Sequence, residues 1–236
     1  MFDYKRGYAA DIESSGIMDI YRLPKFSFYF YQSQYRKTEN TKTDFGKPMI
    51  FIASDWNNSA TKEVKVFSNC DEVALLLNDK LIARQKPDAD QFSDKLTRPP
   101  FTFQINRFEP GTLTAIGFIN GKEMVKSAQQ TPATPSHIQL SIDYSGKAIQ
   151  SGKPDIVFVY ARITDANGTV ITDAKNIVKF TVKGNAELVG INPVKVEAGI
   201  ATILLKTGDT KGEIIITAGA ENLSEAMIKV IPTSAK

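Results

Sequence analysis

The sequence predicts a mainly β protein in which two antiparallel β-sandwiches in series follow a short aromatic segment. Short apolar runs of strand length recur along most of the chain, with turn signals about every eight to twelve residues. Only one stretch, near the beginning, has the period of a helix. The proline-rich hexapeptide TPATPS, at 131–136, divides the strand series in two. A chain of 236 residues has room for two domains of about a hundred residues each.

The opening stretch is the most aromatic part of the chain, and its run KFSFYFYQSQYR predicts a helix. Phe26, Tyr29 and Phe30 keep the i, i+3, i+4 spacing of one helix face, while Phe28 and Tyr31 add apolar surface elsewhere. Such a helix must be covered on most of its circumference. We therefore expect it to pack on the neighbouring sandwich, on a second copy of the chain, or on something outside the chain, and we expect positions 1–21 to be largely irregular.

Residues 40–131 are predicted to form the first sandwich. The turns at Asn78-Asp79 and Asn120-Gly121 fit tight hairpins, because these residue types tolerate positive φ. Phe92 is an isolated aromatic residue in a polar loop at 87–100. Strands or hairpins are expected at 49–54, 63–68, 72–85, 101–105 and 111–128.

Residues 132–236 are predicted to form the second sandwich. Val157, Val159, Ala161 and Ile163 alternate on one strand face, and an Asn-Gly turn follows them. The order of these segments resembles bacterial immunoglobulin-like domains. Strands are expected at 137–143, 155–163, 169–171, 177–182, 186–190, 199–206, 212–219 and 224–231.

Composition argues against several classes of function. The 29 basic and 26 acidic residues nearly balance, and no basic block interleaves with aromatic residues, so nucleic acid is not an expected partner. Cys70 is the only cysteine, which excludes an intrachain disulfide and predicts a small buried residue in a strand. A catalytic triad resting on the single His137 is not expected. No run is long enough to span a membrane, so no membrane partner is expected, and no signal peptide is recognised.

The string FDYKRGY, followed by DIESSGIMDIYRLPKFSFYFYQSQ, closely resembles the end of the catalytic β/α barrel in glycoside hydrolase family 2, in particular the β-galactosidase-like enzymes of Bacteroides-type bacteria. The phrases VFSNCDEVALLLNDKLIARQKPD and IVFVYARITDANGTVI resemble the accessory sandwich domains that follow the barrel in those enzymes. The resemblance implies that the chain is the carboxy-terminal portion of a larger glycosidase. Residues 1–39 would be a remnant loop and one aromatic helix of the last barrel unit.

A retaining glycosidase needs two carboxylates about 5 Å apart, and Asp3, Asp11, Glu13 and Asp19 lie close together in the sequence. We do not assign them as that pair, because the resemblance places both catalytic glutamates on earlier barrel strands, upstream of this chain. No catalytic residue is therefore assigned, and the chain by itself is expected to be inactive.

The turn FDYKRGY has a better claim to lie near substrate. Barrel active sites lie at the carboxyl ends of the strands. The resemblance therefore places Asp3, Tyr4, Arg6 and Tyr8 on the loop that leaves the last strand, near the sugar pocket of the intact enzyme. A structural role in closing the barrel is the alternative.

Sugar-binding modules on sandwich scaffolds use exposed aromatic platforms. Trp56, in an Asn- and Ser-rich loop, is the first candidate for stacking on a sugar, with Phe92 and Tyr144 behind it. The alternative for Trp56 is a cap on the sandwich core.

Asp165, Asn167 and Thr169 could be read as a calcium loop, but a hairpin turn is the preferred interpretation, and no metal or other cofactor is expected. Asn-x-Ser/Thr triplets begin at Asn57, Asn167 and Asn222. They are not expected to be glycosylated, since the resemblance implies a bacterial source.

The function predicted from these observations is that of a non-catalytic accessory region of a retaining β-glycosidase, β-galactosidase-like. Its partners would be its own barrel, a carbohydrate, or a second copy bound through the aromatic helix. The alternatives are an autonomous carbohydrate-binding module and a structural spacer or adhesin-type stalk. The resemblance implies a periplasmic or extracellular location, with which one unpaired cysteine is compatible.

Overall fold

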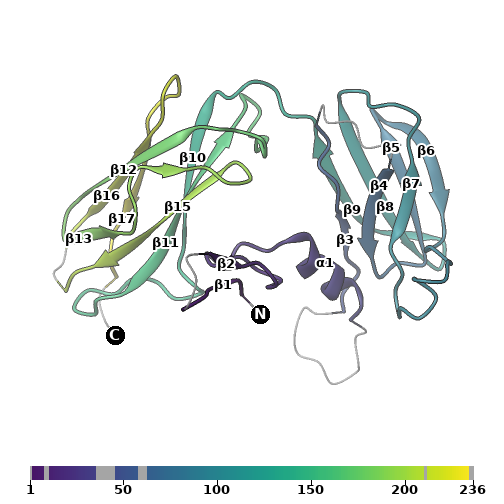
Figure 1. Cartoon of the computed structure of the whole chain (residues 1–236), viewed down its shortest axis with the longest axis horizontal. Helices are drawn as coiled ribbons and strands as arrows, with labels where there is room; N and C mark the ends of the chain where they lie inside the picture. Colours follow the sequence, from purple (N-terminus) through teal and green to yellow (C-terminus); the bar gives the residue numbers. More distant parts are fainter. Residues whose placement is uncertain (1, 8–10, 36–45, 58–62, 210–211, 234–236) are drawn as a thin grey trace. The chain divides into compact units, whose positions relative to one another are not determined.

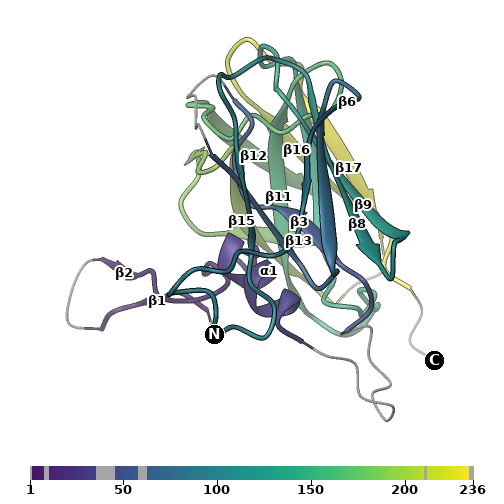
Figure 2. The same ribbon diagram turned by 90° about the vertical axis from the view of Figure 1, so that its right-hand side faces the viewer.

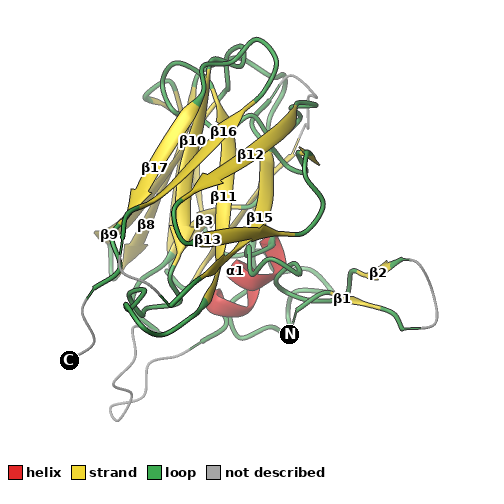
Figure 3. Cartoon of the chain, turned by 90° about the vertical axis from the view of Figure 1, so that its left-hand side faces the viewer, coloured by secondary structure: helices red, strands yellow, loops and turns green. Residues whose placement is uncertain are grey.

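The computed structural model describes residues 2–7, 11–35, 46–57, 63–209 and 212–233. Strands dominate the described residues, and one helix accompanies them (Figure 3). All the pairings between named strands are antiparallel. The prediction of a mainly β chain of antiparallel sheets is thus confirmed. The chain divides into two compact units, Met1–Thr131 and Pro132–Lys236 (Figure 1).

The first unit contains one two-stranded ribbon and two larger sheets. The ribbon pairs β1 with β2, and the larger sheets have the strand orders β3-β4-β7 and β6-β5-β8-β9. The elements are β1 (Tyr4–Lys5), β2 (Ile12–Glu13), α1 (Phe26–Ser33), β3 (Ile50–Ile52), β4 (Glu63–Ser68), β5 (Glu72–Leu77), β6 (Lys80–Gln85), β7 (Phe101–Gln104), β8 (Thr112–Ile119) and β9 (Lys122–Gln130).

Burial alternates along β3, β4 and β7, as period-two side-chain placement requires. Val64 and Val66 on β4, and Phe101 and Phe103 on β7, are buried in the core together with Leu75 of β5. The residues between them on β4 and β7 therefore lie on the outer face of the three-stranded sheet. Cys70 is buried, as expected, but it lies in the bend between β4 and β5 and not in a strand.

Both predicted hairpin turns of the first unit are present. Asn78 and Asp79 have φ of 50° and 63°, and Leu77 pairs with Lys80 across them. Asn120 and Gly121 have φ of 51° and 76°. These positive values explain why Asn, Asp and Gly occupy the turns.

Helix α1 packs on the outer face of the three-stranded sheet. The ring of Tyr29 stacks on Phe51 of β3, with the ring centroids 3.6 Å apart, and Phe26 meets the same ring edge-on at 5.8 Å. Phe30 packs edge-on against Phe67 of β4 at 5.5 Å. Of the partners expected for the aromatic helix, the structure thus provides the neighbouring sandwich. The β1–β2 ribbon extends away from α1 (Figure 2), and two-residue strands are its only regular structure.

The second unit has two four-stranded sheets, of order β10-β11-β15-β13 and β14-β12-β16-β17. Val157, Val159, Ala161 and Ile163 share the core face of β11, as predicted. The segment 169–171 was predicted to be a strand, which is wrong, since only Val170 forms an isolated bridge. The strands are β10 (His137–Asp143), β11 (Ile156–Thr164), β12 (Ile177–Lys183), β13 (Ala186–Val189), β14 (Val194–Lys195), β15 (Ile200–Thr207), β16 (Ile214–Gly219) and β17 (Ala226–Val230).

Candidate functional site

Asp3 anchors the segment that precedes the helix. Its side chain is 8% exposed. Its Oδ1 accepts hydrogen bonds from the Gly16 backbone N–H at 2.9 Å and from Lys25 Nζ at 2.6 Å. Lys25 Nζ also donates to the backbone oxygen of Ser14 at 2.9 Å. Asp3 is therefore engaged with its own segment.

Arg6 forms ion pairs with Glu13 on the facing strand β2 and with Asp11 just before it. Its guanidinium lies 2.9 Å from a carboxylate oxygen of Glu13 and 3.4 Å from one of Asp11. Asp19 Oδ1 accepts hydrogen bonds from two backbone N–H groups, those of Tyr21 and Leu23, and burial raises the pKa of this carboxyl. Every carboxylate of this segment thus has a local partner.

Large apolar side chains of this segment and of helix α1 remain exposed to solvent. We use the name N-terminal apolar surface for three of them that line one groove, Phe2, Tyr4 and Tyr31, which are 48 to 60% exposed. A groove of about 520 Å³ runs between the rings of Phe2, Tyr4 and Tyr31 and the loop at 15–17. Tyr4, expected near substrate, lies in this surface, and Tyr8 lies outside the described residues.

Trp56 does not offer a sugar platform, which corrects the expectation of stacking. Its side chain is only 2% exposed and belongs to the core of the first unit. The indole packs against the ring of Phe108, with centroids 4.9 Å apart. The alternative, in which Trp56 caps the sandwich core, describes this residue, because the faces of the indole are already covered.

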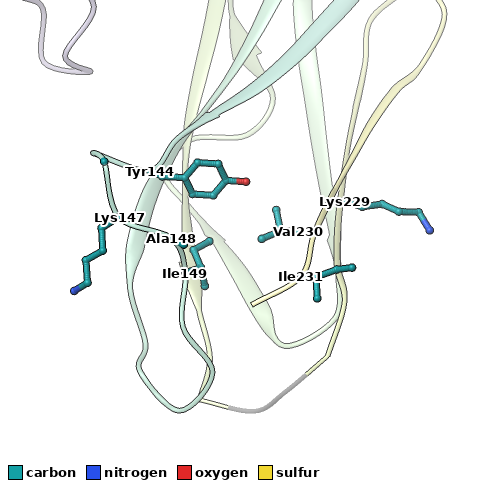
Figure 4. A pocket seen from close by; sticks show the side chains of 8 residues that line it. Tyr144, Lys147, Ala148, Ile149, Lys229, Val230 and Ile231 are labelled. Carbon is teal, nitrogen blue, oxygen red and sulfur yellow. The ribbon is translucent and has the colours of Figure 1, made fainter. Parts of the chain in front are cut away.

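The two other aromatic candidates lie at cavities. Phe92 is 81% exposed beside a cavity of about 590 Å³ in the first unit. Tyr144 lines one of about 510 Å³ in the second unit, where its ring points toward Val230 while Lys147 and Lys229 point outward (Figure 4). Lys229 is held by Glu213 at 3.2 Å. Of these two cavities, the Phe92 cavity has the more varied polar lining.

The loop after β11 is a hairpin turn closed by Asp165. One carboxylate oxygen accepts hydrogen bonds from the backbone N–H groups of Asn167 and Thr169, each at 2.9 Å, and the other from Ala133 at 3.0 Å. The Ala133 N–H, followed by those of Thr169 and Asn167, lowers the pKa of Asp165. The carboxylate oxygens thus face donors within the chain. Among the described residues, no cluster of three or more His, Cys, Asp and Glu side chains is arranged to hold a metal ion. No helix in the described ranges is long and apolar enough to cross a membrane.

Two domain families match the chain, one in each unit. Residues 59–125 match a domain of unknown function (DUF4982), and residues 138–229 match the glycoside hydrolase family 2 C-terminal domain 5. The antiparallel sheets are thus consistent with C-terminal β-sandwich domains of glycoside hydrolase family 2.

Sequence relatives cover nearly the whole chain. A β-galactosidase of Thermoanaerobacter pseudethanolicus is 34% identical across 95% of this chain, and a β-galactosidase of Bacteroides ovatus is 28% identical across 95%. The chain spans 31% and 26% of the length of these two relatives. The chain thus matches the carboxy-terminal portion of glycoside hydrolase family 2 enzymes, whose C-terminal domain 5 corresponds to residues 138–229.

Solved structures show the same fold. A β-glycosidase from Bacteroides vulgatus superposes with a TM-score of 0.80 at 22% identity, over 98% of this chain and 30% of that protein. A β-glucuronidase from glycoside hydrolase family 2 gives 0.79 at 23% identity, over 100% and 25%.

Proposed function

We propose that this chain is a non-catalytic accessory region of a longer retaining β-glycosidase, β-galactosidase-like, and that it braces the catalytic barrel. The two β-galactosidase relatives, each about three times as long or more, support this proposal. From the resemblance given above, we infer that the complete enzyme acts in carbohydrate breakdown in the periplasm or outside the cell.

The N-terminal apolar surface is the observation that carries the proposal. Helix α1 uses Tyr29 and Phe30 to bind its own sandwich, whereas Tyr31, on the same helix, is 60% exposed. Exposed apolar patches of this kind mark interaction sites. The surface belongs to the segment that resembles the last barrel unit, so the barrel is the partner that fits it.

The sequence left two alternative functions, a carbohydrate-binding module and a structural spacer or stalk. A carbohydrate-binding module based on Trp56 lacks support, because the indole is buried. A spacer or stalk does not require clustered exposed aromatic side chains at one end. A second copy of the chain remains the alternative partner for the surface.

The test is Tyr31→Ser in the complete enzyme encoded by the gene. The variant is expected to lower the thermal midpoint of the barrel and the hydrolysis of a chromogenic β-galactoside after heating. Leu81→Ser, at an exposed position of the same unit, is the matched control and should change neither. Equal behaviour of the two variants would argue against the brace. Concentration-dependent dimerisation of the isolated chain that Tyr31→Ser abolishes would favour the second copy.

A further inference from the structure

The first unit contains a cavity that the accessory function does not use. We call it the loop cup. It lies between the loop at 87–100 and the outer face of β4 and β7, with a volume of about 590 Å³. Its floor consists of four polar side chains, and its wall includes Phe92 and the apolar Leu96 and Pro100. The floor residues are Glu63, Lys65, Thr102 and Gln104.

Phe92 is held in solvent by its own loop. Asp90 Oδ1 accepts hydrogen bonds from the backbone N–H groups of Phe92 at 2.8 Å and Ser93 at 2.9 Å, and from Ser93 Oγ at 2.9 Å. Ser93 Oγ in turn accepts a bond from the Asp90 backbone N–H at 3.0 Å, and Ser93 is 5% exposed. The Ser93 N–H, then the Phe92 N–H, lower the pKa of Asp90.

The base of the same loop is fixed to β7. Asp88 Oδ1 accepts a hydrogen bond from the Thr102 backbone N–H at 3.0 Å, and its Oδ2 accepts one from Thr102 Oγ1 at 2.6 Å. The Asp88 backbone N–H donates to the oxygen of Pro100 at 2.8 Å. Asp88 and Asp90 therefore order the loop, and a ligand that meets Phe92 does not have to order it again.

The remaining polar groups of the floor are free to exchange partners. Glu63 and Gln104 are directly paired across β4 and β7, and Gln104 Nε2 donates to Glu63 at 3.3 Å. Lys65 Nζ lies 3.4 Å from Glu63. These are long contacts between partly exposed side chains, which contribute little to stability. Together they offer a carboxylate acceptor, an amide and an ammonium donor to the hydroxyl groups of a ligand.

We propose that the loop cup is a binding site for a neutral oligosaccharide. An aromatic face with carboxylate, amide and ammonium groups around it suits the alternating C–H faces and hydroxyls of a sugar ring. The volume lies within the range of small-molecule sites. Glu63, Asp88 and Asp90 provide three carboxylates against the single ammonium of Lys65, which disfavours uronic acids and sulfated sugars.

The loop cup shares no residue with the N-terminal apolar surface. The binding site and the bracing function therefore rest on different observations, and either can fail without the other. The alternation in EVKVFS and FTFQ predicts that Glu63, Lys65 and Gln104 lie on the solvent-facing sides of their strands. The pairing that brings the two strands together is visible only in the structure.

The test is a titration of the whole chain, labelled with ¹⁵N, with cellotetraose, galactotetraose and trigalacturonic acid, followed by amide chemical shifts. One of the two neutral sugars is expected to give saturable shifts at Phe92, Ser93 and the Gln104 side-chain amide. Phe92→Ala should weaken that binding by about tenfold or more, since one stacked ring is removed. Trigalacturonic acid should bind more weakly than the neutral sugar.

Ile191→Ala is the matched control, because Ile191 is 87% exposed in the second unit; it should leave binding unchanged. Gln104→Ala provides a second variant and should also weaken binding. The proposal is overturned if neither neutral sugar shifts these amides, if binding is equal in the wild type and Phe92→Ala, or if only the acidic trisaccharide binds.

Discussion

The rings of Tyr29 and Phe51 lie parallel, with an interplanar angle of 6° and 3.6 Å between their centroids. This stack joins helix α1 to the edge strand β3. It covers the apolar part of an outer sheet face whose remaining part, on β4 and β7, is polar and forms the floor of the loop cup. One part of this sheet face therefore holds helix α1, and the other part forms the floor of the loop cup.

Tyr29→Ala is expected to destabilise the docking of α1 by about 1–3 kcal/mol, since the ring is half-buried and stacked. The urea midpoint of the first unit should fall, and chymotrypsin should cut the helix sooner. Tyr31→Ala is the control on the same helix, because Tyr31 is 60% exposed. A helix that is protected equally in both variants would contradict this role of the stack.

Alkaline pH is expected to loosen the same contact. Burial raises the pKa of Tyr29 above its ordinary value of 10.0. The folded state therefore keeps its proton where the unfolded state has lost it. Stability from this residue is complete below pH 10 and falls as the pH rises from there toward the raised value. Urea midpoints at pH 8 and pH 10.5 measure the effect; Tyr29→Phe, which cannot ionise, should show a smaller decrease, and an equal decrease would refute the assignment.

Lys25→Met should release the segment around Asp3. The substitution leaves an almost buried carboxylate with the Gly16 N–H and without its ammonium partner, which costs about 1–3 kcal/mol. Hydrogen exchange at the amides of Asp3 and Gly16 should accelerate. Asp11→Asn, at an exposed ion pair of 3.4 Å, should leave both rates unchanged. Unaltered exchange in Lys25→Met would contradict this structural role of Asp3.

Gly117→Ala is expected to destabilise the first unit by about 1–3 kcal/mol, because an added methyl group overpacks the core. A Cβ at Gly117 would lie 2.6 Å from Cys70 Sγ and 3.0 Å from a methyl carbon of Val125. Urea unfolding gives the loss, and labelling of the Cys70 thiol, whose pKa burial raises, should become faster. Gly7→Ala is the control, since a Cβ there has no neighbour within 4 Å. A double variant with Cys70→Ala should recover part of the loss, and no recovery would show that the clash lies elsewhere.

The strands and turns could be predicted because their signals are local. Each of these signals is contained within a few neighbouring residues: the alternation in EVKVFS, the turn pair Asn120-Gly121 and the aromatic spacing of α1. Trp56 could not be placed in this way, because its partner Phe108 is far along the chain. The loop cup depends on the pairing of Glu63 with Gln104, which only the folded sheet defines. The short strand β14 has too few residues to show a period.

Trp56 is the only tryptophan of the chain, and it lies in the core of the first unit. Tryptophan fluorescence therefore follows the melting of the first unit alone, because the second unit contains no tryptophan. Calorimetry of the same sample records both units. Comparison of the two traces shows, without a label or a truncated chain, whether the sandwiches melt as one cooperative body or one after the other.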